Sequence, residues 1–252
     1  MPEFRRFEWN SVEYSGAFES LLRCSSERTV LVPHLQQQLD QLSESSVAAD
    51  WGAGTGDLTS LLAESCATTY AIEPSEPMQH ILQENVPGVQ LIEGDVTTAC
   101  PPSPTDYALL AHVLYHLPDE EWSRIVNRLL TYLSPSGKLV IVMKGRESGC
   151  NAMLEYFSAP RFDIIQQLTP SIEGMPGFQL EVQHLPATIT TDNFADTEAI
   201  ARFMMSDRNA CEFKIPPQEP EFLQYVKANF WNPDRNCGGW DYDLAVMTIQ
   251  RR

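Results

Sequence analysis

A glycine-rich turn directly after a short apolar segment constrains this chain more than any other feature. Residues 47–56 read VAADWGAGTG, so the apolar stretch leads into Gly52, Gly54 and Gly56. Glycine lets a backbone pass close to a ligand or adopt a positive φ angle. A second apolar stretch follows and ends in the carboxylate of Glu73. Together they predict a nucleoside pocket at the edge of an α/β sheet.

The spacing of these glycines argues against a dinucleotide. The pattern is G-x-G-x-G, and Asp57 follows it at the expected first turn of a helix. A pyrophosphate binds the amides of a helix N-terminus, where a carboxylate repels it. A nucleoside ligand without phosphate fits better. S-adenosylmethionine is such a ligand, because it joins ribose hydroxyls to a cationic amino acid end. A dehydrogenase is therefore disfavoured.

The segment resembles motif I of the class I S-adenosylmethionine-dependent methyltransferases, an acid and any residue before G-x-G-x-G. The resemblance continues in order through residues 73–75 (EPS), 93–96 (EGDV), 106–117 (DYALLAHVLYHL) and 137–142 (GKLVIV). It implies S-adenosylmethionine as cofactor and S-adenosylhomocysteine as product. By position, the cofactor would be bound by Asp50, Gly52, Gly54, Gly56, Glu73, Pro74, Ser75, Asp95, Val96 and His112. Each acid alone is equally typical of a helix cap or a turn, but the ordered set favours the cofactor site.

Strand and helix patterns alternate through the middle of the chain, which predicts parallel strands with crossover helices on both faces. We expect strands at 47–51, 69–73, 89–93, 106–111 and 138–143, with helices at 58–65, 76–84 and 119–133. Beyond these we expect helices at 150–157, 161–168, 194–206 and 219–230, and strands at 178–190 and 244–249. The resemblance implies a Rossmann-like sheet of seven strands, mostly parallel, with an antiparallel last strand.

The organisation is predicted to be a single methyltransferase domain over residues 1–252. Two helical pieces within residues 11–42 precede the first strand, so residues 1–45 are expected to form a helical lid. Residues 46–144 would be the cofactor-binding core. Residues 145–252 would be a substrate-side elaboration that includes the final strands.

Composition narrows the classes of partner. Lys and Arg number 17 against 34 Asp and Glu, a formal net charge of −17, which opposes binding to nucleic acid and favours a small neutral or cationic partner. The six cysteines form no C-x-x-C pair, so no metal site is expected. No run of 18 apolar residues and no signal-peptide pattern is present, which predicts a cytoplasmic protein without a membrane partner. We expect a monomer or a homodimer.

Residues 14–19 (YSGAFE) and 21–28 (LLRCSSER) resemble the N-terminal part of the histamine N-methyltransferase family. The resemblance implies methyl transfer to a nitrogen of a small amine or imidazole compound. By position, Tyr14 would lie near cofactor and substrate, and Glu27 would pair with a cationic amine. Tyr242 or Asp243 falls near an asparagine of that family. His112 departs from the family, which has a glutamine at this position, so the resemblance does not establish histamine itself as the acceptor.

Tyr14, Glu27 and His112 are therefore the candidate catalytic residues, for orienting the acceptor or removing a proton. A core aromatic, a helix N-terminal charge and a strand-end packing residue are the respective structural alternatives. His116 is interpreted as a packing residue. The aromatic residues of 230–242 would line an acceptor pocket or fill the core. Two other functions stay open: an O-methyltransferase acting on a small carboxylate or hydroxyl metabolite, and a noncatalytic S-adenosylmethionine-binding scaffold.

Overall fold

The computed structural model describes residues 2–8, 11–159, 163–206, 213 and 217–252. The chain divides into two compact units. The first, here the accessory unit, contains Met1–Val30, Lys144–Asp163 and Pro186–Leu244, and the second, here the core unit, contains Leu31–Met143, Ile164–Leu185 and Ala245–Arg252. The predicted single domain and its lid remain predictions.

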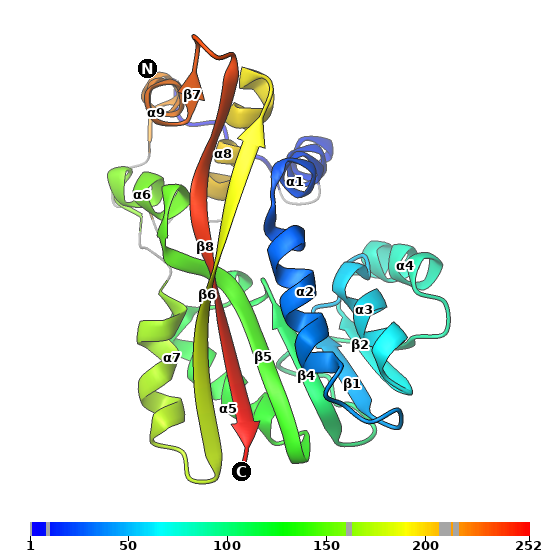
Figure 1. Ribbon diagram of the computed structural model, residues 1–252. Helices are drawn as coiled ribbons and strands as arrows, with labels where there is room; N and C mark the ends of the chain where they lie inside the picture. Colours follow the sequence, from blue (N-terminus) through cyan, green and yellow to red (C-terminus); the bar gives the residue numbers. More distant parts are fainter. Residues whose placement is uncertain (1, 9–10, 160–162, 207–212, 214–216) are drawn as a thin grey trace. The chain divides into compact units, whose positions relative to one another are not determined.

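The core unit is built on a sheet in which the strands follow the order β3-β2-β1-β4-β5-β8-β6. Its strands are β1 (Val47–Trp51), β2 (Thr68–Glu73), β3 (Gln90–Glu93), β4 (Thr105–Ala111), β5 (Leu133–Ser148), β6 (Phe178–Thr191) and β8 (Cys237–Arg251). The pairs β1–β2, β1–β4, β2–β3 and β4–β5 are parallel. The arrow of β8 points opposite to those of β5 and β6 (Figure 1). The predicted seven-stranded sheet with an antiparallel last strand is confirmed.

Helices flank this sheet on both faces (Figure 1). They are α2 (Glu27–Leu39), α3 (Asp57–Ser65), α4 (Glu76–Asn85), α5 (Trp122–Leu130) and α7 (Ile164–Glu173), with short 3-10 turns η1 (Leu114–His116) and η2 (Asp119–Glu121). The part of α2 from Leu31 onward belongs to the core unit. Periodicity explains α5, because its residues 122, 125, 126, 129 and 130 are all buried along one stripe. The central strands are buried almost throughout, as parallel strands covered on both faces must be.

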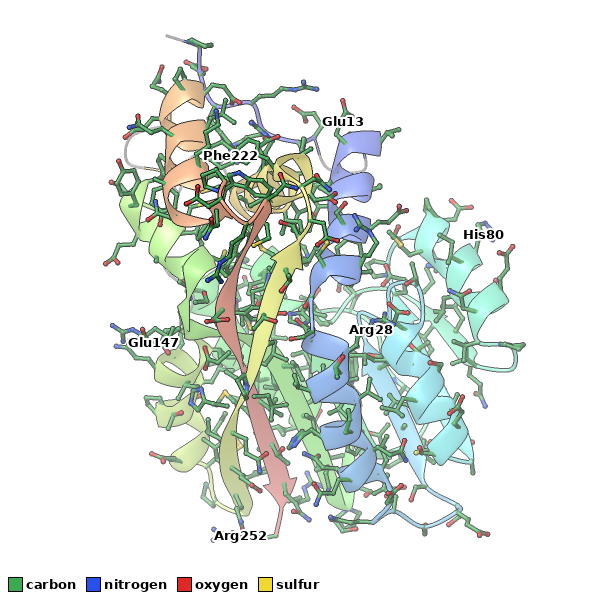
Figure 2. All side chains as sticks on the ribbon, turned by 45° about the horizontal axis from the view of Figure 1, so that its top comes forward. Glu13, Arg28, His80, Glu147, Phe222 and Arg252 are labelled. Atoms are coloured by element: carbon green, nitrogen blue, oxygen red, sulfur yellow. The ribbon has the colours of Figure 1, made fainter. Side chains whose placement is uncertain are left out.

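The accessory unit contains α1 (Val12–Cys24), α6 (Gly149–Tyr156), α8 (Phe194–Ser206), α9 (Glu219–Asn229) and the two-residue strand β7 (Trp231–Asn232). Phe222 lies fully buried among its side chains, with ring contacts to Phe4 and Phe157 (Figure 2). The ends of β5, β6 and β8 belong to this unit as well. β7 pairs antiparallel with the start of β8.

Two features of this region differ from the sequence expectations. No strand was expected at β7, and β8 begins at Cys237 rather than at Leu244. Residues 161 and 162 of the helix expected at 161–168 lie outside the described residues, as does Cys211. The five described cysteines are free thiols. Within the described ranges, no helix is both long and apolar enough to cross a membrane.

Candidate functional site

The glycine turn follows the carboxyl end of β1 and is hydrogen-bonded to the neighbouring strand, β2. The amides of Gly52 and Ala53 both donate to the carbonyl oxygen of Ile72, at 2.8 and 3.0 Å. Gly52, Gly54 and Gly56 have φ angles of 84°, 55° and 91°, in the region that side chains disfavour. The sequence therefore needs glycine at all three positions to make this turn.

The three glycines differ in what surrounds them. A Cβ atom on Gly52 would lie 2.4 Å from Val113 Cγ2, and one on Gly56 would lie 2.7 Å from Leu82 Cδ1. A Cβ atom on Gly54 would meet nothing within 4 Å. Gly52 and Gly56 are thus packed against the protein, whereas the α-carbon of Gly54 faces open space that a ligand can fill.

Glu73 ends β2 beside this turn and is almost fully buried, at 6% exposure. Its Oε2 accepts a hydrogen bond from the Gly54 amide, and its Oε1 accepts one from the Ser75 amide, both at 2.8 Å. The side chain of Gln79 donates to the Glu73 carbonyl oxygen at 2.7 Å. Two backbone donors thus fix the plane of the carboxylate, and each oxygen keeps a further lone pair for hydroxyl donors. Pro74, which follows, is exposed.

Asp50 lies inside β1 and is buried, at 3% exposure. Burial raises the pKa of its carboxyl to about 6; the hydrogen bond from Thr59 Oγ1 to its Oδ2, at 2.6 Å, opposes this shift, and the charge of Glu73 adds to it. Thr59 was not anticipated from the sequence. It stands in the first turns of α3, and nothing in its local pattern distinguishes it from an ordinary helical threonine.

Asp95 follows β3, next to the buried Val96 in the chain. The backbone amides and hydroxyls of Thr97 and Thr98 all donate to Asp95 Oδ1. The side-chain hydrogen bond from Thr97 is the largest of the effects that lower the pKa of the Asp95 carboxyl, so it is held as an anion. The side chain is solvent-exposed.

His112 follows β4 directly. Its amide donates to the Val142 carbonyl oxygen at 2.9 Å, and its φ angle is 58°, the left-handed region that is uncommon for a residue with a side chain. Its ring stacks on Tyr115, with centroids 5.9 Å apart. Because Val113 packs on Gly52, the loop after β4 meets the glycine turn, and the structure brings His112 to the sheet edge that carries Glu73.

Tyr14 lies on α1 in the accessory unit. Its ring packs against Phe203 of α8, with centroids 4.8 Å apart, and Tyr14 is partly buried. Phe18, one turn later on α1, contacts the same ring at 5.7 Å. This contact agrees with the structural alternative for Tyr14, and the role expected from position remains a prediction.

Glu27 opens α2 in the same unit and belongs to a small polar cluster. The Tyr242 hydroxyl donates to Glu27 Oε2 at 3.1 Å and lies 2.6 Å from Ser25 Oγ. The Glu27 amide donates to Ser25 Oγ at 3.0 Å. The ammonium of Lys144 lies 5.9 Å from the centre of the Tyr242 ring and donates to the Met204 sulfur at 2.9 Å.

The contact between Glu27 and Tyr242 was not anticipated from the sequence, because the two residues are 215 positions apart and no local pattern links them. Lys144 was not anticipated as a site residue. Phe230, Trp240 and Tyr242 are buried, whereas Trp231 is partly exposed.

His116 is solvent-exposed in η1, so its interpretation as a packing residue was wrong: the short turn directs it outward while Leu114 is buried. Within the described residues, no group of three or more His, Cys, Asp and Glu side chains gathers as a metal site would require.

Comparisons with known proteins agree with this architecture. Residues 48–137 match the family described as "Methyltransferase domain". An uncharacterized methyltransferase of Anoxybacillus flavithermus is 34% identical over 96 residues, which cover 38% of this chain and 45% of that protein. The chain thus spans about half the length of the curated relatives it matches.

Two solved structures show the same fold at low sequence identity. YcgJ from Bacillus subtilis superposes with a TM-score of 0.62 at 12% identity, covering 88% of this chain and 97% of YcgJ. The magnesium protoporphyrin IX methyltransferase of Synechocystis, determined with bound S-adenosylmethionine, has a TM-score of 0.54 at 14% identity, covering 99% of this chain and 88% of its own. Residues 48–137 are therefore similar to a methyltransferase domain, and the chain has the α/β fold that both solved structures share.

Proposed function

We propose that this chain is an S-adenosylmethionine-dependent methyltransferase acting on a small molecule, and that the accepting atom is a nitrogen of an amine or imidazole compound. One observation carries the proposal. The Glu73 carboxylate is fixed by the amides of Gly54 and Ser75 beside the open space at Gly54. A buried, oriented carboxylate at the end of β2 suits the two adjacent hydroxyls of a ribose.

Each group of residues at this edge of the sheet binds a different part of the cofactor. Glu73 accepts from the ribose hydroxyls, and Asp95 with Val96 borders the adenine. Gly52, Gly54 and Gly56, with Asp50 behind them, take the cationic amino acid end, while Pro74 and Ser75 close the ribose side. The sulfonium of the cofactor supplies an already activated methyl group, so the protein mainly aligns the acceptor and excludes water.

Tyr14, Glu27 and His112 stay the proposed catalytic residues, each for its own chemistry. A carboxylate such as Glu27 suits a cationic group, the face of an aromatic ring such as Tyr14 suits the same kind of group, and an imidazole such as His112 can orient an accepting nitrogen or take up its proton. An imidazole has both a donor and an acceptor atom, so it suits either of these two tasks. No metal is required for this chemistry.

A second candidate function has its own supporting observation. Lys144 lies beside Tyr242, and an ammonium there would suit a carboxylate acceptor, as an O-methyltransferase needs. Glu27 in the same cluster argues the other way, because it repels such a substrate. A noncatalytic scaffold would bind the cofactor without turnover.

Calorimetric titration with S-adenosylhomocysteine tests the cofactor site. Glu73→Gln keeps the shape of the side chain but loses its charge, and we expect roughly 100-fold weaker binding. Glu64→Gln, on the exposed face of α3, is the matched control and is expected to bind normally. Equal affinity in both variants would contradict the ribose assignment.

Methyl transfer from S-adenosylmethionine to panels of amines, imidazoles, carboxylates and hydroxyl compounds then tests the acceptor. Turnover confined to nitrogen compounds supports the proposal. Turnover confined to acids or alcohols would instead support the O-methyltransferase. Binding of S-adenosylhomocysteine without turnover of any panel compound would favour the scaffold.

A further inference from the structure

Arg128 of α5 is hydrogen-bonded to the turn that follows β3, residues 95–99. Its Nη1 donates to the Val96 carbonyl oxygen at 3.0 Å, and its Nη2 donates to the carbonyl oxygen of Ala99. One guanidinium therefore joins both ends of the turn. Because a guanidinium carries its donors in a rigid planar fork, two simultaneous hydrogen bonds also fix the direction of the turn. All of these residues belong to the core unit.

Two aromatic rings hold the guanidinium itself in place. Its central carbon lies 5.1 Å from the centre of the Tyr132 ring and 5.9 Å from that of the Trp51 ring. The two rings lie 5.7 Å apart between centroids, and Trp51 is only 1% exposed. A cation over an aromatic face is attracted to it. Because Trp51 ends β1, Arg128 connects the turn after β3 to the strand that leads into the glycine turn.

The peptide group between Val96 and Thr97 transmits this contact to Asp95. A trans peptide is planar, and its C=O and N–H point to opposite sides. The carbonyl oxygen of this group accepts from Arg128, and its N–H donates to Asp95 Oδ1 at 2.8 Å. Hydrogen bonds on the two sides of one peptide group polarise each other. The orientation of the Asp95 carboxylate therefore depends on Arg128 through a single peptide group.

Asp95 is held through one of its two oxygens. The amides and hydroxyls of Thr97 and Thr98 all donate to Oδ1, so the lone pairs of Oδ2 can accept from a ligand. Glu73 and Glu93 are paired in the register of β2 and β3, so Asp95 follows just beyond the level of Glu73. The base of a nucleoside extends from its ribose. With the ribose at Glu73, Asp95 Oδ2 is therefore offered to the base.

We propose that Arg128 is a positioning residue for the adenine of the cofactor, which holds the turn after β3 so that Asp95 accepts from the exocyclic amine of the base. The inference rests on the proposed function and deepens it, because it assigns the discrimination between adenine and bases without that amine to a residue that acts only through the turn. Arg128 takes no part in methyl transfer. Its contribution is the direction of the Asp95 carboxylate.

Calorimetric titration with two ligands tests this role. S-adenosylhomocysteine carries the adenine amine, and S-inosylhomocysteine carries a carbonyl oxygen at the same place. We expect the wild type to prefer S-adenosylhomocysteine by roughly tenfold or more, and Arg128→Met, which has a similar apolar stem but no donor, to lose most of that preference. Arg128→Lys keeps the charge without the fork and should retain an intermediate preference. Arg124→Met is the matched control, because Arg124 lies one turn earlier on α5 and pairs with Glu121, and it should behave as the wild type.

The ratio of the two affinities separates positioning from packing. A wild-type ratio in Arg128→Met, even with equal losses for both ligands, overturns the inference. If that variant does not fold, a wild-type ratio in Arg128→Lys overturns it in the same way. A wild-type protein that binds both ligands equally well would show that the amine is not recognised, and this also overturns the inference. Failure of the wild type to bind S-adenosylhomocysteine would instead refute the proposed function.

Amide hydrogen exchange in the ligand-free protein tests the contact with the turn and needs no cofactor. In Arg128→Met we expect the amides of Thr97 and Thr98 to exchange roughly tenfold faster, because the peptide group between Val96 and Thr97 is no longer held. The amide of Gly54, which donates to Glu73, should keep its rate. Equal acceleration at all three amides would mean a general loss of stability and would overturn the positioning role, as would unchanged rates in the turn.

Discussion

Gly54 and Gly52 illustrate how two residues of one turn serve different ends. Both have positive φ angles, yet an added methyl group would collide with Val113 at Gly52 and would enter open space at Gly54. A substitution at Gly52 therefore acts on folding. A substitution at Gly54 mainly affects the binding of a ligand in that space, because the left-handed backbone costs a residue with a side chain only about 1–2 kcal/mol in stability.

We expect Gly54→Ala to fold but to bind S-adenosylhomocysteine at least tenfold more weakly, because its methyl group occupies the ligand's space. Gly88→Ala is the control, since Gly88 also has a positive φ angle and open surroundings but lies in the turn before β3. Calorimetry and thermal unfolding of both variants separate the two effects. If the two variants bind equally well, the space at Gly54 is not the ligand site.

Asp50 gives a prediction about pH. Its folded pKa of about 6 lies above the value of 3.8 for a free carboxyl, so the folded state binds more protons than the unfolded state between these values. Stability is therefore greatest below pH 4 as far as this group is concerned, and falls as pH rises towards 6. The loss amounts to about 3 kcal/mol.

Asp50→Asn removes this charge while an amide oxygen still accepts from Thr59. We expect the variant to be more stable than the wild type at pH 7 to 8, and the difference to shrink as pH falls towards 4. Urea unfolding at several pH values measures it. A variant that is less stable at pH 8 would show that the ionised carboxylate has a stabilising partner.

At the scale of elements, α1 and α8 are joined by two kinds of contact. Arg23 pairs with Asp196 at 3.0 Å, and the Arg23 side chain is 63% exposed. Tyr14 and Phe18 pack on Phe203, which is 5% exposed. An exposed ion pair contributes at most about 1 kcal/mol, whereas truncating a buried phenylalanine costs about 3–5 kcal/mol. The aromatic contact should therefore dominate.

Accordingly, Phe203→Ala is expected to destabilise the protein by about 3 kcal/mol or more, and Arg23→Gln by less than about 1 kcal/mol. Urea unfolding gives both values, and amide exchange in α1 shows whether the helix opens first. Equal losses in the two variants would mean that the ion pair carries more of the contact than its exposure indicates.

The elements of the core unit could be predicted because each is set by its own residues. The stripe on α5 and the buried run of β1 are complete within a few positions of the chain. The start of β8 could not be predicted, because Gly238 and Gly239 argue locally against a strand. In the structure they are needed there: an added Cβ atom would lie 2.7 Å from the Phe230 carbonyl oxygen at Gly238 and would collide with Ile189 at Gly239.

The candidate site divides in the same way. The glycine turn and Glu73 lie close together in sequence, so their spacing already carries the geometry. Glu27 and Tyr242 are joined only by tertiary structure, and whether Tyr242 or its neighbour Asp243 faced the site depended on the register of β8. A shift of one residue reverses the face of a strand, which propensity alone does not fix.

For the molecule as a whole, charge is the dominant property. A formal net charge of −17 means that acidic groups repel one another in the folded state more strongly than in the expanded unfolded chain. Salt screens this repulsion, and the Debye length shrinks from about 30 Å at 0.01 M to about 8 Å at 0.15 M.

We therefore expect the melting temperature at pH 7.5 to rise by roughly 2–4 °C between 0.01 and 0.15 M sodium chloride, which corresponds to roughly 1 kcal/mol. Differential scanning calorimetry with the buffer held constant measures the shift. A melting temperature that falls with salt would mean that attractive pairs outweigh the net repulsion.

The backbone of His112 has a consequence for how sequences related to this one can diverge. Its φ angle of 58° costs glycine less than any residue with a side chain. Selection for thermal tolerance alone would therefore favour glycine over the imidazole at this position. A laboratory evolution experiment under heat, with and without a requirement for methyl transfer, tests this. Retention of the histidine only where methyl transfer is required would show that the ring is needed for activity.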